Sequence, residues 1–441
     1  MRSLLIRLNN KIPLSIKNLV KASAYNGVAT IVRMVLGLVS NKINSIYLGP
    51  SGYAILGQYI NYNTILTTFG TGGINSGLIK YTAEYHNQLD KREKIINTSI
   101  FIVLICSAVV GLLNIIFCKF LSIYLLKSSQ YWSIFVITGF MITLNSIGTV
   151  IAGLLNALKQ ITKLITTQII VNFIGVLVTI PLVILYNVYG ALLSLLVIAP
   201  VTVYVNYKFL MKSGFDFKKV RPLFHRESFF KLGKFSVMAF TTALMLPVSQ
   251  IIIRNFIITN ISQESAGYWQ GVLKLSSIYM SVIISSLTLY YLPRLSEIKD
   301  PKELRSEIFS GYAVLLPLMI AISLSIFIFR DHIINILFTE SFKPMRELFP
   351  FHLLGDLFKI ASWLLAFLMV AKAKGKMYII TEVIFASSYL VFALLFIKKF
   401  GVIGITYAYS LNYFIYFLLF IIIFRNLIFK PKSPSIQDSL R

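Results

Sequence analysis

The chain has 441 residues, of which 57% are hydrophobic and only 13% charged, and its mean hydropathy is +0.78. Soluble proteins carry about a quarter charged residues, so this composition excludes a soluble globular enzyme and predicts a polytopic membrane protein. The formal net charge of +26 would suit a nucleic-acid partner, but the cations lie in short loops between apolar runs, which is the pattern of membrane topology.

The first residues, 1–23, are basic and amphipathic, without the apolar core and cleavage site of a signal peptide. Apolar runs of membrane-spanning length follow. Because every backbone amide in lipid must be satisfied within its own segment, these runs predict an all-α protein. We expect about twelve transmembrane helices, at residues 22–46, 53–79, 94–118, 131–157, 162–186, 189–211, 232–256, 266–292, 307–329, 347–372, 375–397 and 402–426.

The basic residues predict the orientation of these spans. Counted over the connectors, Lys and Arg number thirty on one side and eight on the other, which places both termini in the cytoplasm. The longest basic connector, residues 208–234, falls at the midpoint of the chain. We therefore predict an N-terminal six-helix lobe at 1–211, a cytoplasmic connector at 212–231, a C-terminal six-helix lobe at 232–426 and a cytoplasmic tail at 427–441.

The two predicted lobes echo each other in sequence. LGPSGYAILGQY (48–59) and SQESAGYWQGVL (262–273) each open an apolar span, and their Gly-Tyr pairs lie 215 residues apart. Two six-helix halves that both begin in the cytoplasm are related by an axis along the membrane normal. This arrangement favours alternating access between two lobes.

Charged side chains are rare within the predicted spans. The cations are Arg33, Lys42, Lys274 and Lys359, with Arg254 at an outer span end, and the inner carboxylates are Asp356 and Glu382. Each intramembrane charge costs roughly 2.5–3.5 kcal/mol on insertion scales, so we expect these side chains to face an interior cavity. The surplus of cations over acids predicts a cavity that attracts an anion.

Structural alternatives stay open for several of these residues. Lys42 and Arg254 could extend to the lipid headgroups instead, and Glu382 is more readily explained as a structural residue near the cytoplasmic end. Asp356 and Lys359 are three residues apart, so they could form a neutral pair on one helix face or take part in ion coupling.

The stretch AGYWQGVLKLSS predicts contacts to a polar substrate. Gln270 lies on the same helical face as Lys274, one turn nearer the predicted outer entrance. We expect Trp269 to stack on a sugar and Gln270 to bond its hydroxyl groups, with Lys274 placed for phosphate. An interfacial anchor is the alternative for Trp269.

Signatures of enzymes are missing from the sequence. It has no phosphate-binding GxxxxGK[ST] loop, no HExxH and no GxSxG, and its histidines show no metal-ligand spacing. Cys106 and Cys118 would lie about 18 Å apart on one helix, beyond the reach of a disulfide. We therefore predict a transporter rather than an enzyme, without cofactor or metal, and with coupling to a proton or sodium gradient as an option.

Several stretches resemble a known family. They are YLGPSGYAILGQY (47–59), LIKYTAEYHN (78–87), LGKFSVMAF (232–240), LPVSQIIIRN (246–255), GYWQGVLKLSS (267–277), YYLPRLSEI (290–298), FKPMRELF (342–349) and HLLGDLFKIASW (352–363). The chain thereby resembles the Wzx-type lipid-linked oligosaccharide flippases, which include O-antigen translocases and lipid III flippases, in the multidrug/oligosaccharidyl-lipid/polysaccharide exporter (MOP) superfamily. The resemblance covers about residues 18–425.

This resemblance implies a fold, a substrate and a place in the cell. It implies a MATE-like bundle of two lobes around a cationic cavity, located in the bacterial inner membrane. The implied substrate is an undecaprenyl-diphosphate-linked repeat unit, of the O-antigen or enterobacterial-common-antigen type, moved from the cytoplasmic to the periplasmic leaflet for lipopolysaccharide or related polysaccharide synthesis. A polysaccharide polymerase and a chain-length regulator are the implied partners.

The resemblance also bears on individual residues. Lys42, Arg254, Asp356 and Lys359 stand where similar proteins carry ionisable residues, whereas Lys274 stands where a serine is expected. A cation-coupled multidrug exporter and a peptidoglycan lipid II flippase remain as alternatives. The first would need interior carboxylates for cationic drugs, and the second usually has additional spans.

Overall fold

A computed structural model of the chain describes residues 14–217, 220–372 and 375–429. Within this part the chain is helical, with no β-strand, which confirms the all-α polytopic fold class. The predicted absence of a signal peptide and the distal part of the predicted tail concern residues 1–13 and 430–441, which lie outside the described residues.

Two long helices of the N-terminal half are each kinked in the middle. The helices are α2 (Leu14–Gly70), α3 (Asn75–Glu84), α4 (Leu89–Ile116), α5 (Cys118–Leu126), α6 (Trp132–Ala157) and α7 (Ile161–Met211), with a 3₁₀ turn η1 (Ser129–Tyr131). At Gly49 in α2, φ is 61° and ψ is −176°, a conformation that essentially only glycine adopts, and Pro50 follows. Asn187 kinks α7 with a φ of 48°. Each kink separates two predicted spans.

The C-terminal half has one main helix for each predicted span. Its elements are α8 (Arg226–Asn260), α9 (Gln263–Ser286), the π-helical turn η3 (Leu287–Tyr291), α10 (Leu292–Glu297), α11 (Pro301–Ile328), α12 (Arg330–Leu337), the 3₁₀ helix η4 (Glu340–Leu348), α13 (Phe349–Ala371), α14 (Gly375–Phe400), the 3₁₀ turn η5 (Gly401–Ile403), α15 (Gly404–Ile423) and α16 (Arg425–Phe429). The stretch between the predicted spans 307–329 and 347–372 is therefore ordered as α12 and most of η4.

Helices of membrane-spanning length run through both halves. In the described part of the chain, seven stretches are long and apolar enough to cross a membrane, and those containing α7 and α14–α15 have 51 and 48 residues. A crossing needs about 20 residues, so these two are long enough to cross twice. The membrane character of the fold is confirmed, and the count of twelve crossings stays a prediction.

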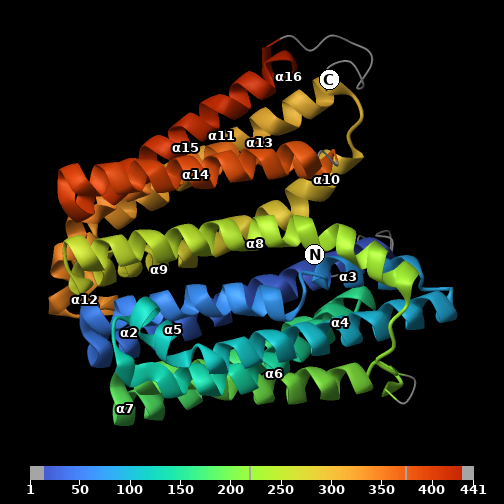
Figure 1. The fold of residues 1–441 in the computed structure, drawn as a ribbon. Coiled ribbons are helices and arrows are strands. Elements are labelled where there is room, and N and C mark those ends of the chain that lie inside the picture. Colours follow the sequence, from blue (N-terminus) through green and yellow to red (C-terminus); the bar gives the residue numbers. More distant parts are fainter. Residues whose placement is uncertain (1–13, 218–219, 373–374, 430–441) are drawn as a thin grey trace, which may run out of the picture.

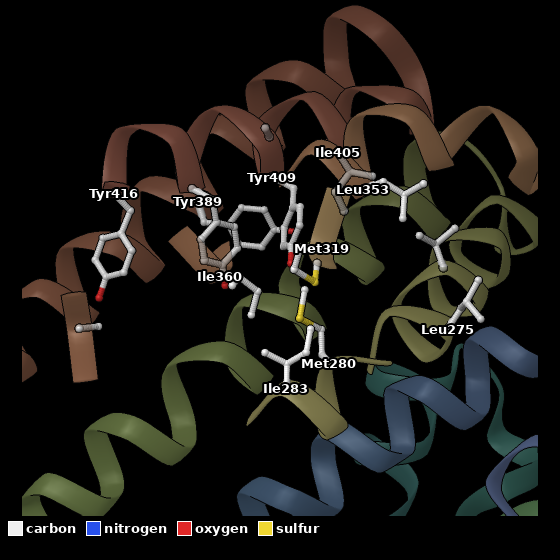
Figure 2. Packing of buried hydrophobic residues seen from close by; sticks show 14 of the residues in the cluster. Leu275, Met280, Ile283, Met319, Leu353, Ile360, Tyr389, Ile405, Tyr409 and Tyr416 are labelled. Carbon is white, nitrogen blue, oxygen red and sulfur yellow. The ribbon is translucent and has the colours of Figure 1, made fainter. Parts of the chain in front are cut away.

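Helix α8 of the C-terminal half lies next to the helices of the N-terminal half (Figure 1). Buried residues of the N-terminal half form clusters that include Leu232 and Ile251 of α8. A further cluster contains Ile253 and Ile257 of the same helix and otherwise draws almost wholly on the C-terminal half. Figure 2 shows part of this last cluster, including Met280, Met319 and Tyr409. Helix α8 thus joins the cores of both halves.

The echoed Gly-Tyr pairs mark places of close helix approach. A Cβ atom on Gly52 would lie 2.6 Å from Cγ2 of Val188, beside the kink of α7. A Cβ atom on Gly267 would lie 1.9 Å from the carbonyl oxygen of Pro50, beside the kink of α2. At Gly267 the neighbouring atoms are backbone, so any side chain would displace α2, whereas at Gly52 the side chain of Val188 would have to move. In the second half, this contact holds the start of α9 against α2.

We predict that Gly267→Ala lowers the free energy of unfolding by about 2 kcal/mol, the usual cost of overpacking. The measurement is denaturation of the purified protein in detergent. Gly233→Ala in α8 is the matched control, because a Cβ atom there meets nothing within 4 Å. If both variants were equally stable, the close contact of α9 with α2 would not be part of the native structure.

Candidate functional site: charged groups between the two halves

Arg254 is the most completely buried of the predicted cavity cations. Its side chain is 0% exposed on α8. One guanidinium nitrogen donates to Oε1 of Gln58 in α2 over 3.0 Å, and the other terminal nitrogen donates to Oε1 of Gln270 in α9. A buried charge needs several hydrogen bonds to replace its hydration. Arg254 therefore ties α8, α2 and α9 together, and we call this group the arginine clasp.

The structure differs from the expectation for Trp269. Its side chain is 1% exposed in the core of the C-terminal half, and the Arg254 guanidinium lies 5.2 Å from the centre of its ring. The indole face is thus covered by a cation and is not available to a sugar. Gln270 is half-buried, and its amide oxygen accepts a hydrogen bond from Arg254. Gly57 makes room for it, since a Cβ atom there would lie 2.4 Å from the Gln270 amide.

Lys42 is also engaged in contact between the halves. Its ammonium donates to the carbonyl oxygens of Asn335, over 2.9 Å, and of Phe338, at the C-terminal end of α12. The adjacent Asn41 donates to the carbonyl of Leu337 over 2.8 Å. The last carbonyls of a helix lack partners within it and carry partial negative charge, so a lysine is stabilising there. Lys42 therefore holds α12 against α2 in this structure.

Arg33 and Lys274 are the predicted cations that line one cavity between the halves. The cavity has a volume of about 280 Å³ and lies between α2 and α9. Serine residues of α9 share its lining with Lys274, at positions 277, 281 and 285, so the cavity follows one face of that helix. Among its described lining residues there is no carboxylate.

The two cations of this cavity differ in their contacts. Arg33 donates to Oε1 of Gln168 in α7 and to Oγ1 of Thr30, each over 3.0 Å. The ammonium of Lys274 has no hydrogen-bond or ion-pair partner among the described residues. An unpaired cation in a cavity shared with a second cation creates a site for an anion.

Asp356 occupies a separate site within the C-terminal half, and the neutral pair with Lys359, one of the two alternatives left open by the sequence, does not form. Its carboxylate accepts hydrogen bonds from Ser276 over 2.7 Å, from the Tyr409 hydroxyl over 2.7 Å and from Tyr279. The ring of His352 stacks on Tyr409, with Nε2 3.8 Å from the carboxylate. These hydroxyl donors, which come from other helices, satisfy the buried carboxylate in place of the lysine.

Lys359 lies instead among aromatic rings. Its ammonium is 4.9 Å from the ring centre of Trp363 and 5.4 Å from that of Tyr413, and it donates to the Tyr409 hydroxyl over 3.4 Å. Tyr409 thus links the lysine indirectly to Asp356. Figure 2 shows Tyr409 with Tyr389 and Tyr416 in this core. Glu382 of α14, also in the C-terminal half, accepts a hydrogen bond from the Tyr416 hydroxyl over 3.2 Å.

The predicted cationic residues therefore fall into different places. Arg33 and Lys274 share the cavity, Lys42 and Arg254 join the halves, and Lys359 lies in the C-terminal core. Sequence reasoning missed Gln58, Gln168 and the tyrosine partners of Asp356. Gln58 stands five residues after the first Gly-Tyr pair and Gln270 two residues after the second, so their positions gave no signal that both bond Arg254.

Comparisons with known proteins agree on one kind of function. The profile of the family described as "Polysaccharide biosynthesis protein" matches residues 19–299. The lipid III flippases of Escherichia coli (strain K12) and Shigella flexneri are each 28% identical to this chain over 403 residues, covering 91% of this chain and 97% of the relative. These relatives are membrane flippases rather than enzymes.

Solved transporter structures share the fold. An inward-facing multidrug resistance MATE family transporter of the MOP superfamily matches with a TM-score of 0.74 at 12% identity, over 91% of this chain and 100% of that one. The lipid II flippase MurJ, in an inward closed conformation, matches with a TM-score of 0.74 at 16% identity, over 96% and 89%. The expected MATE-like architecture is thereby confirmed.

We predict that Arg254→Ala destabilises the protein by about 3 kcal/mol, because a buried charged hydrogen bond is lost and Gln58 and Gln270 are left without their donor. Thermal denaturation in detergent measures the effect. Arg330→Ala is the control, since Arg330 is half-buried at the start of α12 and, within the described residues, bonds and stacks on Phe327 at the end of the preceding helix α11. Equal melting temperatures for the two variants would contradict the role of the arginine clasp.

Proposed function

The chain belongs to the polysaccharide biosynthesis protein family, and from this premise we propose that it is a flippase for undecaprenyl-diphosphate-linked oligosaccharide. It moves a repeat unit of the O-antigen or enterobacterial-common-antigen type from the cytoplasmic to the periplasmic leaflet of the bacterial inner membrane. The similarity to lipid III flippases over 91% of the chain supports this substrate class. A polysaccharide polymerase and a chain-length regulator are the expected partners in the same membrane.

The observation that carries this proposal is the cavity that Arg33 and Lys274 line between α2 and α9. A diphosphate entering the protein loses water, and cationic side chains replace the lost hydrogen bonds. The ammonium of Lys274, which has no partner in the described part of the chain, is the group best placed to bind it. The lipid tail stays in the bilayer, so only the headgroup needs a polar path.

Transport proceeds by alternating access in this proposal. The N-terminal lobe, 1–211, and the C-terminal lobe, 232–426, move relative to each other around the cavity, with the connector 212–231 between them. Lys42 and the arginine clasp hold the predicted outer ends together. They separate when the cavity opens to the periplasm. Asp356 and Glu382 lie in the C-terminal lobe, and a proton or sodium gradient acts through them if the transport is coupled.

The competing functions fit the cavity less well. A multidrug exporter of cationic compounds needs carboxylates near its substrate, whereas the described lining of this cavity holds two cations and no acid. Asp356 is 0% exposed and already hydrogen-bonded by hydroxyl groups. A lipid II flippase shares the diphosphate group, but the curated relatives by sequence are lipid III flippases.

We predict that Lys274→Ala and Arg33→Ala each lower glycan export at least tenfold, because a charged hydrogen bond of about 1.5–3 kcal/mol is lost. Export is measured as surface polysaccharide in a strain that lacks its own flippase and carries the matching glycan pathway. Lys343→Ala is the control, since Lys343 is exposed and pairs with Glu340 at the predicted outer surface. Normal export by both cavity variants, or gradient-driven ethidium efflux by the unaltered chain, would overturn the proposal.

The orientation gives a second prediction. In a variant whose Cys106 and Cys118 are replaced by serine, Lys343→Cys is expected to react with an impermeant maleimide in the periplasm. Lys302→Cys reacts only after the inner membrane is permeabilised, because it lies in a connector of the basic, cytoplasmic side. Labelling of intact spheroplasts measures both. The reverse pattern would place the termini outside.

A further inference from the structure

A polar cavity that the cationic site does not use is lined mainly by the N-terminal half, with Ala239 and Ala243 of α8 at one side. Two adjoining hollows of about 360 and 370 Å³ share Asn75 and Thr149 in their lining. We call them together the neutral cavity, because no ionisable side chain occurs among their described lining residues. Their size is that of small-molecule binding sites, which begin near 300 Å³.

The lining of the neutral cavity consists largely of amides and hydroxyls. The amides include Asn63, Asn75, Asn156, Gln168 and Asn172. Threonines of α2 also line it, and the hydroxyls of Thr64 and Thr67 donate to carbonyls one turn back along the helix. A hydroxyl that donates in this way still accepts hydrogen bonds. The cavity therefore offers both donors and acceptors without charge.

Two of these amides have unsatisfied buried atoms. Oδ1 of Asn63 and Oδ1 of Asn75 are buried and have no hydrogen-bond partner among the described residues. Gly153 allows the Asn75 amide to lie against α6, since a Cβ atom there would be 2.4 Å from that oxygen. A buried polar group without a partner costs about 1–3 kcal/mol, so its presence at a cavity indicates a ligand that supplies hydrogen bonds.

The neutral cavity borders the cationic cavity at one pair of residues. Gln168 lines the neutral cavity, and its Oε1 atom accepts the hydrogen bond from Arg33, which lines the cationic cavity. A ligand with a diphosphate at Arg33 and Lys274 would therefore present its next group to Gln168 and the amides beyond it. In the proposed substrate that group is the first sugar.

We propose that the neutral cavity binds the uncharged sugars nearest the diphosphate, through their hydroxyl and acetamido groups. This inference rests on the proposed function and adds the place and the chemical class of the glycan. An alkyl chain would leave the amides unsatisfied, and a uronic acid would place a carboxylate where no described lining residue carries a positive charge. The cavity thus selects for neutral sugars, in the half of the protein opposite Trp269.

The test compares binding of three lipids to the full chain in nanodiscs: undecaprenyl diphosphate, the same lipid carrying one N-acetylglucosamine, and the same lipid carrying one glucuronic acid. The unaltered protein is expected to bind the N-acetylglucosamine lipid roughly tenfold more tightly than the bare lipid, from one or two new hydrogen bonds. The glucuronic acid lipid is expected to show no such gain. Equal affinity for all three lipids would overturn the proposal.

Variants separate this inference from the function on which it rests. Asn75→Ala and Thr149→Val are expected to abolish the gain from N-acetylglucosamine and to leave the affinity for bare undecaprenyl diphosphate unchanged. Thr166→Val is the matched control, because Thr166 is half-buried on α7, is absent from the lining of the neutral cavity and, like Thr149, donates to a carbonyl one turn back along its helix. If neither variant reduces the gain, or both weaken the bare lipid equally, the neutral cavity is not the sugar site. If Lys274→Ala leaves the affinity for the bare lipid intact, the proposed function itself fails.

Discussion

The contact between the two halves depends on a positive charge that is removed from water and lipid alike. Arg254 has no exposed surface, so its guanidinium is stable only where Gln58 of α2, Gln270 of α9 and the ring of Trp269 replace its solvent. The glycines beside it follow from this requirement. Gly57 makes room for the Gln270 amide, and Gly267 brings the start of α9 onto the kink of α2. Separating these helices therefore means rehydrating a charge as well as parting two surfaces.

The fold could be predicted from the sequence because its determinants are local. Apolar length defines helices, Gly49 and Asn187 interrupt them, and basic connectors mark one side of the membrane. The site could not be predicted to the same depth, because the partners of each charge come from distant helices. Asp356 and Lys359 have the spacing of an ion pair, yet Tyr409 of α15 bonds the carboxylate and contacts the ammonium. From the sequence, Trp269 near the start of a helix was expected to be accessible to a sugar. Arg254 lies over its ring because α8 packs against α9, and this packing cannot be inferred from the sequence around Trp269.

Positive, uncharged and acidic groups occupy three different places in the protein, and each place has a different role in the proposed transport. The cationic cavity lies between α2 and α9, the neutral cavity is lined mainly by the N-terminal half, and the buried acid Asp356 lies within the C-terminal half. A substrate that is charged at one end and neutral along the rest matches the first two. The carboxylate of Asp356 is bonded by hydroxyl groups and is absent from the described lining of both cavities, so it does not neutralise the cations proposed to bind the diphosphate.

The acceptors of Lys42 and Asn41 are main-chain carbonyls at the end of α12, not side chains. Every amino acid supplies such a carbonyl, so this attachment places almost no demand on the identity of Asn335, Leu337 or Phe338 as acceptors. The exposed positions of α12, Asn335 among them, therefore tolerate substitution without loss of this attachment, provided that the helix still ends where its last carbonyls reach Lys42 and Asn41.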